Sequence, residues 1–465
     1  MSFTGRAHII KSIGVITAIS AVILSCCACR TDNTAIPDIP SPDGSSYSDT
    51  KTSESTKDKD SEEHILYNLK VALPYQDSTV RYLAAMYYAK KNKRWDNNVN
   101  GTNVDLDTLS SMNTDFVVTS SMTSDEGVSS TILENWDHNN AMPDLFMATD
   151  INDAINSGKI MPINDFIAED KTFDNDRIFA NCAMECIKDG KTYGIPHALS
   201  VELIAGNSDY IPGTGRPPVI YTCEEFASYL DSIKSDYEGI VPLMSASDLF
   251  PYIGSAFNRG TRTSFMLNEE YKAQPILTEN VFENENKYIG ALYSEGLSAD
   301  KDSNGASPVF SRQCALWVTS SASLKTWEVY YPSKIYTIFL PSADADNQSP
   351  ANVHFYPLCV SANSSGGKLA ADFGSFISFD QDAQLLIQRL ENRSGFFPVT
   401  RSSAVWDVIY EDPAVGQTSY ILRQILDNAE FVPVDDSDPV FAKAKDYFAD
   451  YPNRQEYSLE ALYGN

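Results

Sequence analysis

Segments typical of β-strands alternate with segments typical of α-helices along the chain from about residue 65. Residues 65–73 are apolar and strand-like, and after a proline-containing turn apolar side chains recur at helical spacing from Val80 to Tyr88. Later, "AMPDLFMATD" and "KIYTIFLP" are strand-like, "CEEFASYLDSIKSD" is an amphipathic helix, and "AADFGSFISFDQDAQLLIQRLENR" is mostly helical. This alternation favours an α/β fold with open, largely parallel sheets covered by helices.

The length of the chain indicates more than one core. The chain has 465 residues, of which 43% are apolar. Residues 64–465 exceed the size at which a single hydrophobic core usually stops growing. We therefore expect two lobes.

The first 25 residues have the layout of a secretory signal peptide. Arg6 and Lys11 give a positive start, and residues 12–25 then carry no charge. This apolar stretch is shorter than the roughly 20 residues that a membrane span needs. A signal peptide over residues 1–25 is therefore predicted, although an uncleaved anchor is an open alternative.

Three cysteines stand directly behind this segment. The sequence Ile-Leu-Ser-Cys at 23–26 resembles the bacterial lipobox, and on that resemblance Cys26 carries the lipid. Leu24 is unusual at its position, so Cys27 and Cys29 are alternative acceptors; a metal cluster is a further reading. Residues 26–63 are rich in Ser, Thr, Asp, Lys and Pro, which predicts a lipidated N-terminus followed by a disordered tether.

The charge of the chain limits its partners. The formal net charge is −28, and removal of Arg6 and Lys11 with the signal peptide would make it −30. A chain this acidic repels nucleic-acid phosphates. Nucleic acid is therefore not expected as a partner.

Five cysteines remain in the body, and their odd number and irregular spacing do not indicate a disulfide framework. Cys182 and Cys186 lie one helical turn apart and have the spacing to share a metal. No second pair or spaced histidine completes such a site, so a buried helix face is the favoured interpretation.

Several segments together resemble bacterial family 1 extracellular solute-binding proteins, the receptors of ABC importers. "AMPDLFMATD" has the Pro-Asp that opens a strand leading to the cleft, and "SGKIMPINDFI" is similar to the family's Gly-x-Leu-x-Pro-Leu-Asp loop. "GKTYGIPHALS", "CEEFASYL", "FSRQCALWVTSS" and "GFFPVTRSSAV" match later motifs in the same order, with Cys223 where the family has Trp. The collinear order from about residue 65 to 430 carries the resemblance.

The resemblance implies a type II periplasmic-binding-protein-like fold, with two lobes, each a mixed sheet covered by helices, joined by crossing segments. Crossings near residues 197–202, near Leu340 and near residues 398–401 would divide the body into 64–198 and 340–399 for lobe 1, and 199–339 and 400–465 for lobe 2. It also implies a monomer on the extracytoplasmic face of the cell membrane that captures a solute, most often a carbohydrate, for an ABC permease.

No catalytic constellation is present in the sequence. The five histidines show no zinc-binding spacing, and the Gly-x-Ser-x-Gly nucleophile elbow is absent. No cofactor, metal or catalytic residue is assigned. The two acids of a glycosidase need no sequence signature, so an exported carbohydrate-active enzyme stays an alternative, as does a ligand-sensing adaptor or peptide-binding receptor of the same fold.

The loop "LPYQDS" follows the first strand. In sugar-binding relatives this loop supplies hydrogen bonds, so the resemblance assigns Gln76 and Asp77 to the ligand. Tyr75 either contacts the ligand or packs beneath the loop. Asp150 follows the second motif strand, where it either faces the cleft or caps the next helix.

The predicted crossing segment adds His197 and Ser200, which face the cleft or are hydrogen-bonded within the fold. Relatives place a stacking Trp shortly after "CALWV", whereas this chain has Ser-Ser-Ala-Ser at 320–323. Ser320 and Ser321 therefore donate to a ligand or cap a helix. Trp317 or Trp327, and the pair Phe396 and Phe397, either stack on a sugar or belong to the core.

Overall fold

The computed structural model describes residues 67–426 except 97, 124–126, 168–177, 251–264, 268–272, 276–278, 300–306, 343–352 and 392–394. The chain divides into two units, Met1–Glu63 and His64–Asn465. The predicted signal peptide, Cys26 and the predicted tether therefore lie outside the described residues. No helix among the described residues is both long and apolar enough to cross a membrane.

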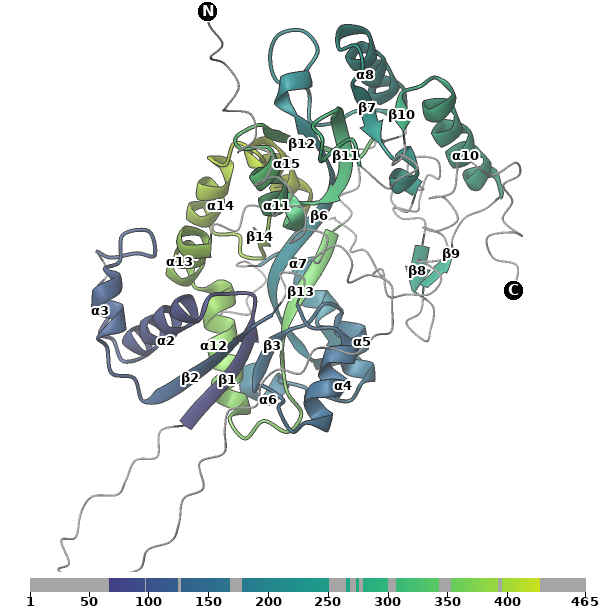
Figure 1. Cartoon of the computed structure of the whole chain (residues 1–465). Helices are drawn as coiled ribbons and strands as arrows, with labels where there is room; N and C mark the ends of the chain where they lie inside the picture. Colours follow the sequence, from purple (N-terminus) through teal and green to yellow (C-terminus); the bar gives the residue numbers. More distant parts are fainter. Residues whose placement is uncertain are drawn as a thin grey trace, which may run out of the picture. The chain divides into compact units, whose positions relative to one another are not determined.

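One mixed sheet of ten strands organises the described body (Figure 1). Its strand order is β10-β7-β11-β6-β13-β3-β1-β2, and β12 and β14 also pair with β6. The bounds are β1 Tyr67–Leu73, β2 Phe116–Met122, β3 Leu145–Met147, β6 Gly194–Asn207, β7 Val241–Met244, β10 Ser298–Ala299, β11 Cys314–Ser320, β12 Ile335–Phe339, β13 Val353–Val360 and β14 Phe397–Pro398.

The long strand β6 joins the two halves of this sheet. All 14 of its residues are buried. Residues 194–201 pair with β13, whereas residues 202–207 pair with β11 and β12. A single continuous strand therefore belongs to both halves, and it includes the crossing segment predicted at residues 197–202.

The first half of the sheet is covered on both faces. Alternate residues of a strand point to opposite faces; accordingly Leu69 and Val71 belong to one core cluster, and Ala72 and Phe146 to another. The first cluster contains side chains of α2 (Asp77–Lys91) and α12 (Gly367–Phe379), with α13 (Gln381–Glu391) packed beside them. The second contains side chains of α4 (Ser130–His138) and α5 (Ile151–Asn156).

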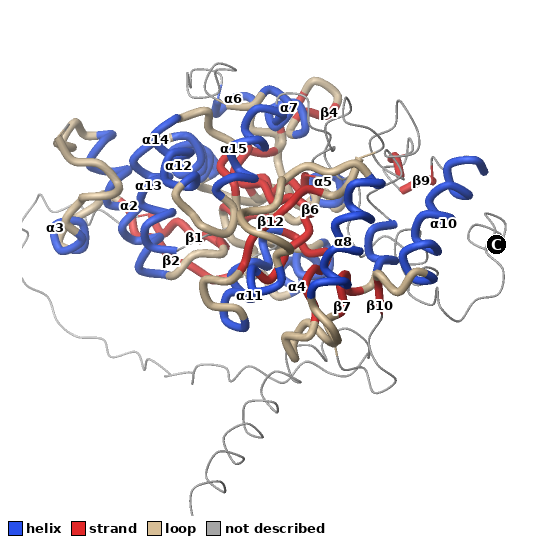
Figure 2. The backbone as a smooth tube through the Cα atoms, turned by 90° about the horizontal axis from the view of Figure 1, so that it is seen from above, coloured by secondary structure: helices blue, strands red, loops and turns tan. Residues whose placement is uncertain are grey.

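The second half follows the same plan. Ile204 and Leu316 pack against α8 (Cys223–Asp236) and α10 (Glu279–Ser294), which Figure 2 shows beside β7 and β10. Their neighbours Leu203 and Trp317 face the opposite way, into the cluster that contains α11 (Leu324–Tyr330) and α15 (Gly416–Ile425). Both halves are thus helix–sheet–helix sandwiches, and the predicted α/β fold with a mixed, covered sheet is confirmed. The expectation of largely parallel pairing is not met, because β6 pairs antiparallel with β11, β12, β13 and β14.

The remaining described elements are short. They are α3 Leu106–Ser110, α6 Asn164–Ile167, α7 Ala180–Glu185, α14 Ser403–Tyr410, β4 Ile187–Lys188, β5 Lys191–Thr192, β8 Phe265–Leu267, β9 Ala273–Pro275, and the 3-10 helices Ser208–Tyr210, Ala246–Leu249 and Ser321–Ser323.

Local sequence explains where two of the helices begin. Helix α8 starts at a capping box, in which the Thr222 side chain accepts from the Glu225 backbone and the Glu225 carboxylate accepts from the Thr222 backbone. The segment predicted as mostly helical forms α12 and α13 with a break at Asp380. There the Asp380 carboxylate accepts from the backbone N–H groups of Asp382 and Ala383 at 3.0 and 3.1 Å.

The five body cysteines are buried and are not joined by disulfides. Cys182 lies in α7, and Cys186 ends that helix, so the two thiols share one buried helical turn. Burial raises the pKa of Cys186 well above its usual value. The described residues contain no group of three His, Cys, Asp or Glu side chains that would hold a metal ion.

Candidate functional site

Polar strand ends from both halves of the sheet meet at the middle of β6. Ser320, at the end of β11, is paired with Glu202, and His354, near the start of β13, is paired with Ser200. Because Ser200 and Glu202 are two residues apart on one strand, side chains from β11 and β13 lie close together here. We define this meeting point, with the adjoining ends of β1 and β3, as the candidate site.

Hydrogen bonds connect the residues at this meeting point. The Ser320 Oγ donates to the Ser200 Oγ at 3.3 Å, and the Ser200 Oγ lies 3.1 Å from the Tyr356 hydroxyl. The Glu202 carboxylate is 2.9 Å from Nε2 of His354, whose side chain is 23% exposed. Ser200 is fully buried and forms the inner part of this network, whereas the His354 side chain is partly exposed.

The serines after β11 anchor the next turn. The Ser320 Oγ accepts from the Ala322 backbone at 3.3 Å. The buried Ser321 Oγ accepts from the Val201 backbone at 3.0 Å and donates to the Gly395 carbonyl. Ser320 therefore has the capping role left open by the sequence. Ser321 caps no helix, and instead ties the end of β11 to the middle of β6.

A buried polar chain holds the loop after β1. The Tyr75 hydroxyl is hydrogen-bonded to Nε2 of His197 on β6, and Nδ1 of His197 is 2.8 Å from the Ser378 Oγ on α12. Tyr75 and His197 are only 2% and 1% exposed. The packing alternatives for both residues are therefore observed, and these side chains position the loop and the central strand relative to each other.

The next two residues of that loop are exposed. The Gln76 backbone N–H donates to the Glu391 carboxylate at 3.1 Å. The side chain of Gln76 is exposed. Asp77 pairs with Arg81 at 2.7 Å in the first turn of α2, and both side chains are largely solvated. An exposed pair of this kind is held weakly, so the Asp77 carboxylate is able to exchange partners.

Asp150 lies three residues after the end of β3, the strand next to β1 in the sheet. Its carboxylate accepts from the backbone of Asn152 at 2.6 Å and of Asp153 at 3.3 Å, so it is the N-cap of α5. Asp150 is half-buried. The structure thus shows the capping role, and contact with a ligand stays a prediction.

The aromatic candidates lie in the core. Trp317 is 3% exposed and stacks on Tyr331 with ring centroids 5.1 Å apart. Trp327, which is half-buried, lies 5.2 Å from Trp317 and donates its Nε1 proton to Thr319. Phe396 is 5% exposed beside Tyr356. Core packing is observed for Trp317 and Phe396, and stacking on a sugar stays a prediction.

Sequence reasoning missed three residues of the site, Glu202, His354 and Tyr356. Glu202 stands at the end of the predicted crossing segment, and its acidic side chain in a buried strand was the available signal. His354 and Tyr356 are two residues apart in β13, a strand that the sequence analysis did not predict. Their contacts depend on the register between β6 and β13, strands that are far apart in the sequence.

Comparison with known proteins identifies the fold but no family. The chain matches no protein-family model and none of the curated proteins. Its structure resembles the ABC substrate-binding protein of Listeria monocytogenes, solved with cycloalternan, with a TM-score of 0.64 and 15% identity over 86% of this chain and 97% of that chain.

Two further solved structures have the same architecture. For the sugar-binding protein MalE of Xanthomonas citri the TM-score is 0.62, at 13% identity over 85% of this chain and 94% of that one. For the Thermus thermophilus maltotriose-binding protein with maltotriose the TM-score is 0.55, at 13% identity over 85% and 96%. The chain therefore has the two-lobed, periplasmic-binding-protein-like fold. The proteins named are binding proteins.

Proposed function

We propose that this chain is a solute-binding protein that captures a carbohydrate between its two lobes and delivers it to an ABC importer. The observation that carries the proposal is structural likeness to sugar-binding proteins across 85–86% of the chain. The polar strand ends that meet at β6 add to this, since a receptor needs hydrogen-bonding groups from both lobes. The proposal requires no covalent chemistry.

Capture depends on differential binding. A ligand that contacts both lobes binds the closed form more tightly than the open form, and so shifts the population toward closure. Strand β6 runs through both halves of the sheet, so we assign the main bend to residues 200–202. The division into lobes at 64–198, 199–339, 340–399 and 400–465 belongs to the same proposal.

Within this proposal the exposed and half-buried polar residues contact the sugar. Gln76, Asp77, Asp150 and His354 would contact it from the first half of the sheet, and Ser320 from the second half, where β11 ends. Hydroxyl groups of a sugar both donate and accept, which suits this mixture of amide, carboxylate, hydroxyl and imidazole groups.

The buried candidates act as positioning residues. They are Tyr75, His197, Ser200 and Ser321, which link the loop after β1, the central strand and the turn after β11, with Trp317 and Phe396 as apolar support.

A thermal-shift screen of the full chain tests the proposal. The panel comprises maltooligosaccharides, other sugars, amino acids, peptides and polyamines. A ligand at about 100 times its dissociation constant adds roughly 2.7 kcal/mol to the free energy of unfolding. A raised melting temperature with one sugar class supports the proposal. A shift only with peptides or amines would leave the fold assignment intact and reject a carbohydrate ligand. Release of reducing ends from the oligosaccharides, measured in a separate assay, would instead indicate a glycosidase.

Asp77→Ala tests the loop after β1. A hydrogen bond to a charged group contributes about 1.5–3 kcal/mol, so affinity for the sugar found in the screen should fall at least about tenfold. Stability should change little, because the pair with Arg81 is exposed. Asp107→Ala is the matched control, since Asp107 is an exposed acid in the first turn of α3. Equal affinities in the two variants would remove Asp77 from the site.

We further propose that lipid attached to Cys26 holds the protein on the extracytoplasmic face of the cell membrane, with residues 26–63 as a tether. Two acyl chains give durable attachment at about 0.8 kcal/mol per buried methylene. In cells fed a labelled palmitate analogue, Cys26→Ala should lose the label and leave the membrane fraction. Retained label would assign the lipid to Cys27 or Cys29.

A further inference from the structure

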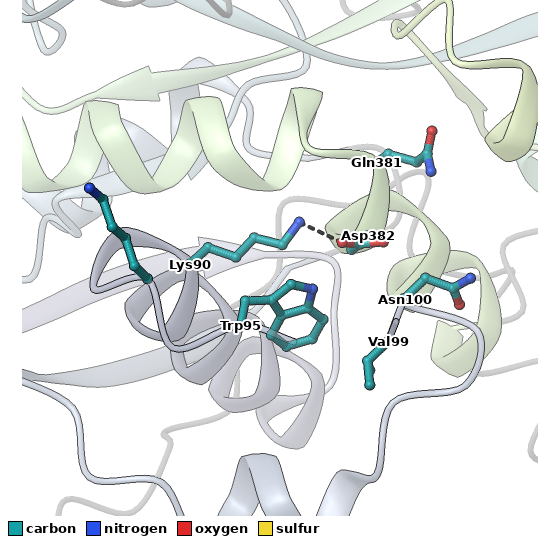
Figure 3. Close-up of a pocket in the computed structure, with 7 residues that line it drawn as sticks. Lys90, Trp95, Val99, Asn100, Gln381 and Asp382 are labelled. Atoms are coloured by element: carbon teal, nitrogen blue, oxygen red, sulfur yellow. Dashed lines mark ion pairs between the residues drawn. The ribbon is translucent and has the colours of Figure 1, made fainter. Parts of the chain in front are cut away.

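A pocket of about 680 Å³ lies away from the candidate site, between the end of α2 and the start of α13 (Figure 3). Its volume falls within the range of small-molecule sites. None of its residues belongs to the candidate site. The lining residues are Lys90, Lys93, Trp95, Val99, Asn100, Gln381 and Asp382.

The wall of this pocket is held firmly. A Cβ atom at Gly101 would lie 2.0 Å from the Asp382 carbonyl oxygen and 2.5 Å from the Leu386 nitrogen, so the loop after α2 is pressed directly on α13. The Asn100 Oδ1 accepts from the Thr102 backbone at 3.0 Å, which fixes the turn. The pocket is therefore preformed, and binding would not have to order it.

Its side chains combine an aromatic ring with groups that form hydrogen bonds. Lys90 Nζ lies 5.5 Å from the ring centroid of Trp95. The indole Nε1 of Trp95 is covered from solvent and has no hydrogen-bond partner among the described residues. Figure 3 shows it on the side of the ring toward Asn100 and Asp382. An unpaired covered donor is unfavourable, and an acceptor oxygen of a ligand would satisfy it once a side-chain shift beside Asn100 exposes it to the pocket.

The charges in the pocket largely cancel. Lys90 Nζ is 2.7 Å from Asp380 and 2.6 Å from Asp382, so two carboxylates face its single positive charge. Lys93, exposed at the rim, balances the second carboxylate. The chemistry therefore suits a neutral ligand with several oxygens and a small apolar face that can lie against Trp95 and Val99. We propose that this pocket is a second ligand site, which binds one or two sugar rings or a similar neutral polyol.

Fluorine NMR of the full chain labelled with 5-fluorotryptophan tests this site directly. The chain has five tryptophans, and Trp95→Phe identifies the resonance of Trp95, with Trp136→Phe as the control at another half-buried tryptophan. Methyl α-glucoside is titrated to about 100 mM, which saturates a site whose dissociation constant is about 1–10 mM. The Trp95 resonance should shift and saturate.

An unmoved Trp95 resonance would overturn the proposal, and so would a shift produced only by inorganic phosphate or acetate. Lys93→Met separates the two ligand classes in the same titration. A neutral ligand should bind this variant within about twofold of the original affinity, whereas an anion held by Lys93 should lose about tenfold or more, as expected for a lost charged hydrogen bond. Because the resonance reports only the surroundings of Trp95, binding in the cleft does not affect the result.

Discussion

Gly395 is a residue beside the site at which the fold leaves no room for a side chain. Its φ is +90°, and an added Cβ would lie 1.9 Å from the carbonyl oxygen of Ser321. Gly395→Ala therefore combines backbone strain with displacement of the turn that holds the end of β11. We expect the free energy of unfolding to fall by roughly 3 kcal/mol or more in chemical denaturation.

Gly239→Ala is the control for this substitution. Gly239 also has a positive φ, +80°, but an added Cβ there would meet no atom of the described residues within 4 Å. The Gly239→Ala variant should lose only about 1 kcal/mol of free energy of unfolding, from backbone strain alone. Equal losses in the two variants would contradict the role of the contact between Gly395 and Ser321.

Two buried thiols give a prediction about pH at the same scale. Burial raises the pKa of both Cys223 and Cys314 from 9.0 to about 12. The folded chain keeps these protons above pH 9 while the unfolded chain releases them, so stability falls between pH 9 and 12 by about 1.4 kcal/mol per pH unit for each thiol.

Maleimide labelling at pH 8, followed by peptide mass spectrometry, measures how far the fold suppresses the reactivity of these two thiols. Cys223 and Cys314 should react slowly in the native chain and rapidly in denaturant, because the thiolate is the reactive form. Equal rates in the two conditions would contradict the burial of these thiols.

At the scale of the elements, a buried hydroxyl pair docks α15 on β12. The Thr337 Oγ1 donates to the Ala414 carbonyl at 2.8 Å and lies 2.7 Å from the Thr418 Oγ1. Thr337→Val keeps the shape of the side chain but leaves that carbonyl unpaired, which should cost about 1–3 kcal/mol in chemical denaturation. Thr326→Val, on the exposed face of α11, should change stability by less than about 0.5 kcal/mol. A loss at position 337 as small as at 326 would contradict this docking role.

Local patterns predicted the elements better than the contacts between them. The helix at 223–236 was predictable because its cap and its apolar face are both local. The exposure of Gln76 and Asp77 follows likewise from their place between a buried strand and a helix. The pairing of Glu202 with His354, and the burial of Tyr75 against His197, depend on strand register and on helix α12, which no local pattern specifies.

At the scale of the whole molecule, the proposed function requires two lobes that close on a sugar. The polar ends of β11 and β13 meet on one strand that belongs to both halves of the sheet. A ligand bridging the two halves would therefore link the ends of several elements at once. Binding should make the molecule more compact as well as more stable.

Small-angle X-ray scattering of the full chain, with and without a saturating sugar identified by the thermal-shift screen, tests closure most directly. The N-terminal residues contribute equally to both samples, so a difference reports on the body. We predict a smaller radius of gyration with the sugar and no change with a sugar that does not raise the melting temperature. Tight binding with an unchanged radius of gyration would contradict closure of two lobes around the ligand.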